Sequence, residues 1–192
     1  MSDTNYEINL VNVRISYPHL FEPKAFQNNG NPKYSARFLL NKEEHADLIK
    51  QIATKCRALA AESYKDKKLP APDKLCIRDG DHSGKDEEVG YWTLNASESG
   101  RPVVVNSDLT PLVAEDDVIF PGCRVNAKIS LWAQDNSYGR RINANLLGVQ
   151  FAGKDEKLGN GRVRQAADEM FEASDFASGD GGAEDDPFGG DL

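Results

Sequence analysis

The residues best suited to chemistry are concentrated in one strand-like segment, 122–134. Alternation of apolar and polar side chains places Trp132, Lys128 and Arg124 together on the polar face of a β-strand. An aromatic ring beside cations is suited to stacking a nucleobase while the cations hold phosphates. We therefore expect these three side chains to contact a nucleic acid. The alternative is that Trp132 packs beneath a loop or against another subunit, with the charges simply solvated.

Neighbouring segments supply further basic and aromatic side chains. In GYWTLNAS, residues 90–97, alternation with Leu94 directs Trp92 into the core and leaves Tyr91 outside. The first two predicted strands and the turn after residue 134 add more candidates. The predicted binding residues are Trp132, Lys128, Arg124, Tyr138, Arg140, Arg141, Lys33, Arg37, Arg14 and Tyr91.

The sequence contains no recognisable catalytic or metal-binding motif. The segment 78–88, RDGDHSGKDEE, has four potential ligands but lacks the ligand spacing of a calcium loop. No P-loop and no GxGxxG is present, and neither His19 nor His45 has a Ser or Cys at a recognisable catalytic spacing. We predict no catalytic residue, metal or cofactor. The alternative is a metal-dependent nuclease or recombination enzyme that uses the acidic loop between Asp79 and Glu88.

The composition is that of an ordinary protein of the cytoplasm. The 192 residues allow one domain with a sizeable core plus an appendage. No apolar run approaches the roughly 20 residues that span a bilayer, and the polar start MSDTNYEINL lacks the features of a signal peptide. The three cysteines form no CxxC pair, which favours free thiols in a reducing compartment. We expect a cytoplasmic protein without membrane contact.

Charge is distributed unevenly along the chain. The net charge is −8, but nine of the 31 acidic residues lie in 167–192, which contains no Lys or Arg. The remaining 22 acids face 23 basic residues in 1–166, so this part is close to neutral. Such asymmetry is typical of an interaction tail. Within the tail, Asp185, Asp186, Pro187 and Phe188 place an aromatic ring in an anionic strand that a partner, or the protein's own surface, could bind.

The element pattern predicts a mostly β protein. A first strand opens at residue 7, with a bulge near Val11 and Asn12 and an end at Pro18, and a second covers 33–40. A capping box at Asn41 and Glu44 and an apolar stripe predict a helix at about 42–64. Two short strands and a hairpin, 122–134 with 140–151, follow. We predict an OB-fold-like closed barrel of five to six strands over residues 1–160 and a disordered acidic tail over 161–192. An open α+β sheet is the alternative.

Several segments together resemble a known family. These are RDGD, GYWTLNAS, PVVV, VIFPGCRVNAKISLWAQDN and GRRINANLLGVQFAGKDEKLG, all within residues 78–159. They are similar to segments of the single-stranded DNA-binding proteins encoded by tailed bacteriophages, and the resemblance extends over about residues 8–160.

The resemblance implies a non-enzymatic protein with an OB-fold core that coats single-stranded DNA during phage replication or recombination in the host cell. It also implies that the acidic tail competes with DNA and recruits phage or host replication and recombination proteins. The near-neutral charge of the rest of the chain predicts modest affinity and binding as an array on DNA or as a homo-oligomer. One departure is that Phe188 is followed by GGDL instead of ending the chain. A protein in which only the tail functions, as an interaction adaptor, is the remaining alternative.

Overall fold

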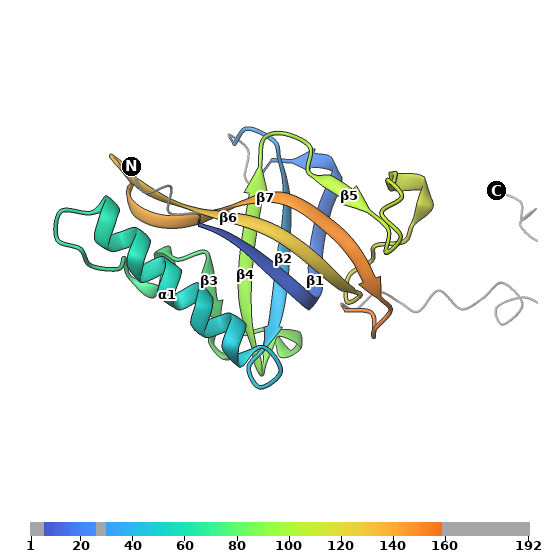
Figure 1. Ribbon diagram of the computed structural model, residues 1–192, viewed down its shortest axis with the longest axis horizontal. Coiled ribbons are helices and arrows are strands. Elements are labelled where there is room, and N and C mark those ends of the chain that lie inside the picture. The colour runs from blue at the N-terminus through green and yellow to red at the C-terminus, as the bar shows by residue number, and fades with distance from the viewer. Residues whose placement is uncertain (1–5, 26–29, 159–192) are drawn as a thin grey trace, which may run out of the picture. The chain divides into compact units, whose positions relative to one another are not determined.

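Five long strands dominate the computed structural model, which describes residues 6–25 and 30–158 (Figure 1). Alternating apolar residues along them supply one buried face, as the sequence predicted. The five strands are β1 (Glu7–Lys24), β2 (Lys33–Asn41), β4 (Tyr91–Glu98), β6 (Arg124–Asn136) and β7 (Gly139–Gly153).

These strands close into a barrel. β1 pairs antiparallel with β2 and with β6, β2 pairs with β4, and β6 pairs with β7. The ring closes where β4 and β7 run parallel, with Ser97 opposite Asn145. Two short strands pair with members of the barrel. β3 (Ile77–Asp79) is antiparallel to β4, and β5 (Val103–Val105) is parallel to β7. The predicted closed barrel is confirmed, and the open sheet is excluded.

Short helical turns complete the elements of the described residues. They are η1 (Pro72–Lys74), η2 (Gly80–His82), η3 (Asp86–Glu88) and η4 (Ala114–Asp116). None of the helices in 6–25 and 30–158 is long and apolar enough to cross a membrane. The predicted acidic tail, 161–192, lies outside the described residues.

The first strand confirms one prediction and corrects another. The bulge predicted near Val11 and Asn12 is present, since the register with β6 shifts there and Asn12 has a φ of 54°. The prediction that Pro18 ends the pairing is wrong. β1 continues to Lys24 because its register with β2 shifts just before Pro18, where Tyr17 has a φ of 47°. A proline at such an irregularity leaves no ladder hydrogen bond unmade.

The predicted helix is present but begins later than expected, as α1 (Ala46–Ser63). The Asn41 side chain accepts hydrogen bonds from the amides of Glu43 and Glu44, as a cap would. In the predicted capping box, the Glu44 side chain would accept a hydrogen bond from the backbone amide of Asn41. That amide instead donates to Nδ1 of His45. Residues 42–45 therefore form a turn ahead of the helix.

The core fills the barrel and extends beneath α1. The predicted inward face of β6 is confirmed, since Val125, Ala127, Ile129 and Leu131 are buried. The helix buries Ile52, Cys56, Leu59 and Ala60. Beyond the helix, the Tyr64 hydroxyl lies 3.1 Å from the carbonyl oxygen of Gln134 and 2.8 Å from that of Arg141. These contacts connect the end of the helix to the β6–β7 hairpin. All three cysteines are buried and free.

Candidate nucleic-acid interface

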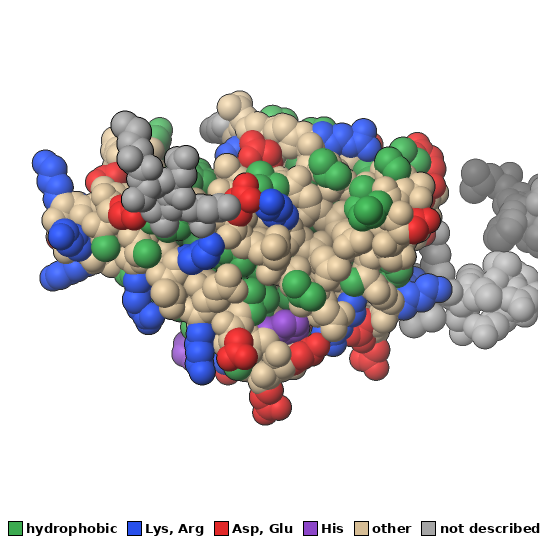
Figure 2. Space-filling view, in the orientation of Figure 1, with side chains coloured by type: hydrophobic (Ala, Val, Ile, Leu, Met, Phe, Trp, Pro, Cys, Tyr) green, Lys and Arg blue, Asp and Glu red, His purple; other side chains and the backbone are tan. Residues whose placement is uncertain are grey.

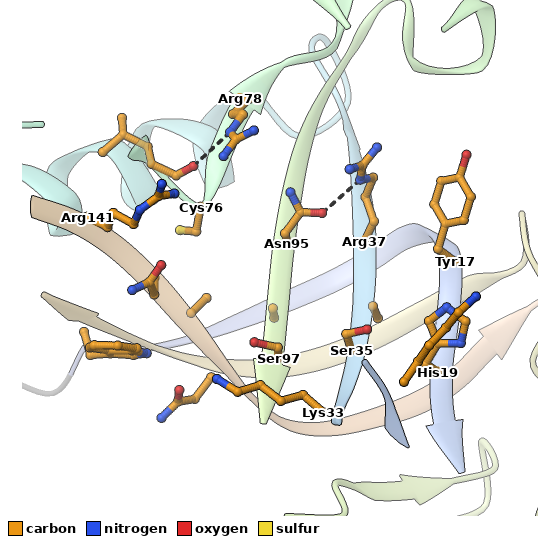
Figure 3. Close-up of a pocket in the computed structure, with 18 of the residues that line it drawn as sticks. Tyr17, His19, Lys33, Ser35, Arg37, Cys76, Arg78, Asn95, Ser97 and Arg141 are labelled. Carbon is orange, nitrogen blue, oxygen red and sulfur yellow. Dashed lines mark hydrogen bonds between the residues drawn. The ribbon is translucent and has the colours of Figure 1, made fainter. Parts of the chain in front are cut away.

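A groove of about 620 Å³ crosses the barrel over β2, β4 and β7 (Figure 3). Its floor has small and polar side chains because every second residue of these strands faces outward there. Small side chains leave the floor open, while serine hydroxyls and asparagine amides offer hydrogen bonds to a ligand. The outward-facing floor residues are Ser35, Asn95, Ser97, Asn143 and Asn145, and the core residues Ala36, Ala96 and Ala144 lie between them.

An aromatic ring stands at each side of this groove. Trp132 lines it from β6, opposite Asn143 in the β7 register, and keeps 39% of its surface exposed. Tyr17 lines it from the second irregularity of β1, just before Pro18, and is 48% exposed. In Figure 3, Tyr17 lies on the far side of the groove from Arg141, which is on the same hairpin as Trp132. Two half-exposed rings can therefore stack on bases at separate points along one groove.

Tyr17 is held in place by cations. The Lys85 ammonium lies 4.5 Å from its ring centroid, and the Arg37 guanidinium lies 5.5 Å away. Arg37 is itself fixed, because it donates to Oδ1 of Asn95 at 2.9 Å and pairs with the buried carboxylate of Glu88. Burial raises the pKa of Glu88, but hydrogen bonds from Ser83 and Arg37 outweigh this and the net shift is downward. Arg37 is thus a positioned member of the groove wall.

The groove contains cations that have no carboxylate partner within the described part of the chain. Lys33 and Arg141, both predicted, line the groove, as do Lys24 and Arg78, which the sequence analysis missed. None of the four forms an ion pair with any residue in 6–25 or 30–158. Unpaired cations over a polar floor are suited to holding a chain of phosphates.

Three predicted cations lie outside the groove and are paired with acids. Arg124, Lys128 and Arg140 are on the hairpin of Trp132, yet none of them lines the groove. Their carboxylate partners are Asp155 and Glu44 for Arg124, Glu7 for Lys128, and Asp66 and Asp135 for Arg140. The closest contacts are 2.7 Å for each of the three cations. Hydrogen bonds from Arg124 and from the Glu156 backbone keep the pKa of Asp155 below its ordinary value.

Arg14 has a structural position instead of the predicted outward one. The residue is buried, and its guanidinium donates to the carbonyl oxygens of Gly122 and Glu156. A Cβ at Gly122, whose φ is 104°, would lie 2.1 Å from that Glu156 oxygen, so only glycine permits this close packing. The prediction that Arg14 faces outward is wrong, because the residue holds the segment after β7 against the barrel.

The remaining predicted aromatics are also outside the groove. The Tyr91 hydroxyl accepts a hydrogen bond from Arg14 at 3.5 Å, and Tyr138 is 85% exposed at the turn of the hairpin. Trp92 packs against the core, as predicted, with the Lys42 ammonium 5.9 Å from its ring centroid.

Asp79 and Asp81 of the acidic loop form ion pairs with a lysine of the same chain. The Lys42 ammonium lies 2.6 Å from Asp79 and 2.5 Å from Asp81. Hydrogen bonding to Lys42 lowers the pKa of Asp79, and a hydrogen bond from the Gly90 amide is the main cause of the lowered pKa of Asp81. In the part of the chain that the structure describes, no group of three or more His, Cys, Asp or Glu residues could hold a metal ion.

A closed five-stranded barrel with a basic, aromatic groove across its strands defines the class of OB-fold nucleic-acid-binding proteins. The family model of the single-stranded DNA-binding protein of Enterobacter phage Enc34 matches residues 6–182, and this chain belongs to that family. The predicted resemblance to phage single-stranded DNA-binding proteins is therefore confirmed. The chain is a member of a family of binding proteins and not an enzyme.

Solved structures and a curated relative agree with this assignment. The single-stranded DNA-binding protein of bacteriophage Enc34, in complex with single-stranded DNA, is 38% identical with a TM-score of 0.74, over 80% of this chain and 90% of that chain. Putative protein p50 of Acyrthosiphon pisum secondary endosymbiont phage 1 is 36% identical over 153 residues, covering 76% of this chain and 82% of the relative. The gp2.5 single-stranded DNA-binding protein of bacteriophage T7, 16% identical with a TM-score of 0.53 over 86% of this chain and all of that one, supports the fold alone.

Proposed function

We propose that this protein binds single-stranded DNA along the groove. Bases stack on Trp132 and Tyr17, and phosphates contact Lys33, Arg78 and Arg141. The observation that carries this proposal is that cations without a carboxylate partner in 6–25 and 30–158 line the same groove as two half-exposed aromatic rings. Stacking requires the face of a base, which a duplex hides between neighbouring pairs, so this arrangement favours a single strand. The DNA complex of the Enc34 relative supports the same ligand.

The protein coats exposed single strands during phage DNA replication or recombination, in the cytoplasm of the infected host. Because the chain outside the tail is close to neutral, one copy binds with modest affinity. Neighbouring copies along the DNA form an array that protects the strand. No contact with a membrane is part of this function.

The acidic tail regulates binding and recruits partners. Its negative charges compete with DNA for the groove cations at a high local concentration. Phage or host replication and recombination proteins bind Asp185, Asp186, Pro187 and Phe188, whose aromatic ring enters an apolar pocket on the partner. The division into a DNA-binding domain, 1–160, and this tail, 161–192, is part of the proposal.

A titration with fluorescent dT oligonucleotides tests the proposed ligand. We expect salt-sensitive binding, with log K falling linearly against log salt, and weaker binding to a duplex of equal length. Incubation with Mg²⁺ should leave the oligonucleotide intact, whereas cleavage would indicate the nuclease alternative. Absence of salt-sensitive binding to any oligonucleotide would contradict the proposal and favour the adaptor alternative.

A further inference from the structure

A second cavity, of about 720 Å³, lies between α1 and the β3–β4 pair. Its volume is within the range of pockets that hold small organic ligands, about 300–1,000 Å³. The walls are mainly apolar, and the aromatic face among them belongs to Trp92. The residues that form these walls are Ile49, Ala53, Leu69, Pro72, Ile77 and Trp92.

This cavity adjoins the proposed DNA groove. The residues Arg37, Leu75, Arg78, Lys85 and Asn95 line both spaces. Arg78 stands at this boundary on the short strand β3, and its Nε donates to the carbonyl oxygen of Leu75 at 3.2 Å. Its two terminal nitrogens make no ion pair within the described residues. A single strand of DNA that leaves the groove beside Arg78 would therefore reach the cavity.

The charge around the cavity favours an anionic ligand. Arg57 of α1 lines it and, like Arg78, has no carboxylate partner in 6–25 or 30–158. Three acids line it, and each is already paired: Asp79 with Lys42, Glu88 with Arg37 and Asp73 with Lys74. Lys and Arg side chains also gather over α1 and the loop after it (Figure 2), where the exposed residues include Lys50, Arg57, Lys65, Lys67 and Lys68.

We infer that this cavity is a subsite for a nucleobase at one end of the bound strand. The base lies between the apolar walls and the exposed part of Trp92, while its phosphate contacts Arg78 and Arg57. His82 and Ser83, which also line the cavity, provide hydrogen-bonding groups for the polar edge of the base. The inference rests on the proposed function, since it requires a strand in the groove.

The test uses the full-length protein and dT oligonucleotides of increasing length, with 2-aminopurine at the 5′ or the 3′ end. In Ala53→Leu, a larger side chain reaches into the cavity from a half-buried position of α1 and narrows it. Its matched control is Ala58→Leu, at an exposed position of the same helix outside the cavity. We expect Ala53→Leu to weaken binding of long oligonucleotides about tenfold, the effect of losing one stacked base, with unchanged binding of short ones. The wild type and Ala58→Leu should quench 2-aminopurine at one end only, and Ala53→Leu at neither.

A second pair of variants covers the case in which Ala53→Leu disturbs folding. Leu69→Asp places a carboxylate at the cavity wall, and Leu109→Asp places one at an exposed position away from it. The inference predicts a loss of terminal quenching in Leu69→Asp alone. The inference is overturned if the affinity of Leu69→Asp depends on oligonucleotide length as in the wild type and if its terminal 2-aminopurine is quenched to the same extent. If the wild type binds oligonucleotides without quenching at either end, the inference fails and the groove proposal stands.

The same variants separate a base from an acidic peptide as the occupant. A labelled peptide with the sequence of residues 184–192, EDDPFGGDL, is titrated against the wild type and Ala53→Leu. We expect no difference between them. Peptide binding that Ala53→Leu abolishes, with 2-aminopurine unaffected, would overturn the assignment to a base. If the wild type binds no oligonucleotide at all, the proposed function itself fails, which is a distinguishable result.

Discussion

Two adjacent arginines provide a sharp test of which cations hold DNA. Arg141 lines the groove and has no carboxylate partner among the described residues, whereas Arg140 pairs with Asp66 at 2.7 Å and Asp135 at 3.4 Å. Both side chains belong to the same strand and carry the same charge. We therefore compare Arg141→Ala with Arg140→Ala.

The expected size of the effect follows from counterion release. Each phosphate contact on a single strand contributes about 0.7 to the slope of log K against log salt. Arg141→Ala should lower the slope by about 0.7, so the loss of affinity between 50 and 200 mM salt becomes about 2.5-fold smaller. Combining Arg141→Ala with Lys33→Ala and Arg78→Ala should lower the slope by about 2. Arg140→Ala should leave the slope within error of the wild type.

Fluorescence anisotropy of a labelled dT oligonucleotide at five or more salt concentrations measures these slopes. Thermal melting of each variant provides the folding control, because Arg140 also lies 4.9 Å from the Tyr64 ring centroid and its removal can lower stability. Equal slopes for Arg141→Ala and Arg140→Ala, with both proteins folded, would refute the argument that unpaired groove cations carry the phosphates.

Further predictions concern stacking, the tail and acid stability. Trp132→Ala should weaken dT binding about tenfold and remove most of the tryptophan quenching, whereas unchanged affinity in a folded variant would assign Trp132 a structural role. Deletion of 167–192 should strengthen DNA binding at about 50 mM salt, where charges are weakly screened, and equal affinity of the truncated and full chains would contradict competition between the tail and DNA. Phe188→Ala should keep this inhibition but lose binding to a replication protein in a pull-down. The lowered pKa of Asp155 adds stability above its unfolded value of about 3.9, and this stability is lost as pH falls through the folded value. The melting temperature should therefore fall below about pH 4, and less steeply in Asp155→Asn.

The barrel could be predicted because its strands carry local signals. Alternation along β6 identifies Val125 and Ile129 as core and Trp132 as outward without knowledge of the partner strands. The bulge at Asn12 was visible as a slip in the same alternation. A period of two residues depends only on neighbouring positions, so a single strand reveals it.

The pairing of cations could not be predicted in the same way. Arg124 meets Asp155, 31 residues later, and Glu44, 80 residues earlier, and nothing near Arg124 in the sequence identifies either acid. The sequence assigns Lys33, Arg37 and Trp132 correctly to outward faces of strands, and it assigns Arg141 to a turn. Only the barrel shows that these four residues share one groove. Long-range pairing separates the groove cations, which we propose bind phosphates, from the cations that pair with acids of the described residues.

Two groove residues were missed for identifiable reasons. Tyr17 precedes Pro18, and a proline within an alternating segment predicts the end of a strand, so the sequence does not place Tyr17 inside β1. An aromatic residue directly before such a proline is the signal that points to it. Arg78 lies in a strand of three residues that was interpreted as part of an acidic loop. Strands this short leave too few alternating positions for a pattern to be recognised.

Photocrosslinking tests whether single-stranded DNA lies in the groove between Tyr17 and Trp132. A dT oligonucleotide carrying 5-iodouracil at each position in turn is irradiated on the full-length protein, and the crosslinked residues are identified by mass spectrometry. We predict crosslinks to Tyr17 and Trp132 from different positions of one oligonucleotide. Crosslinks confined to Tyr138 or Tyr91, both outside the groove, would contradict the account.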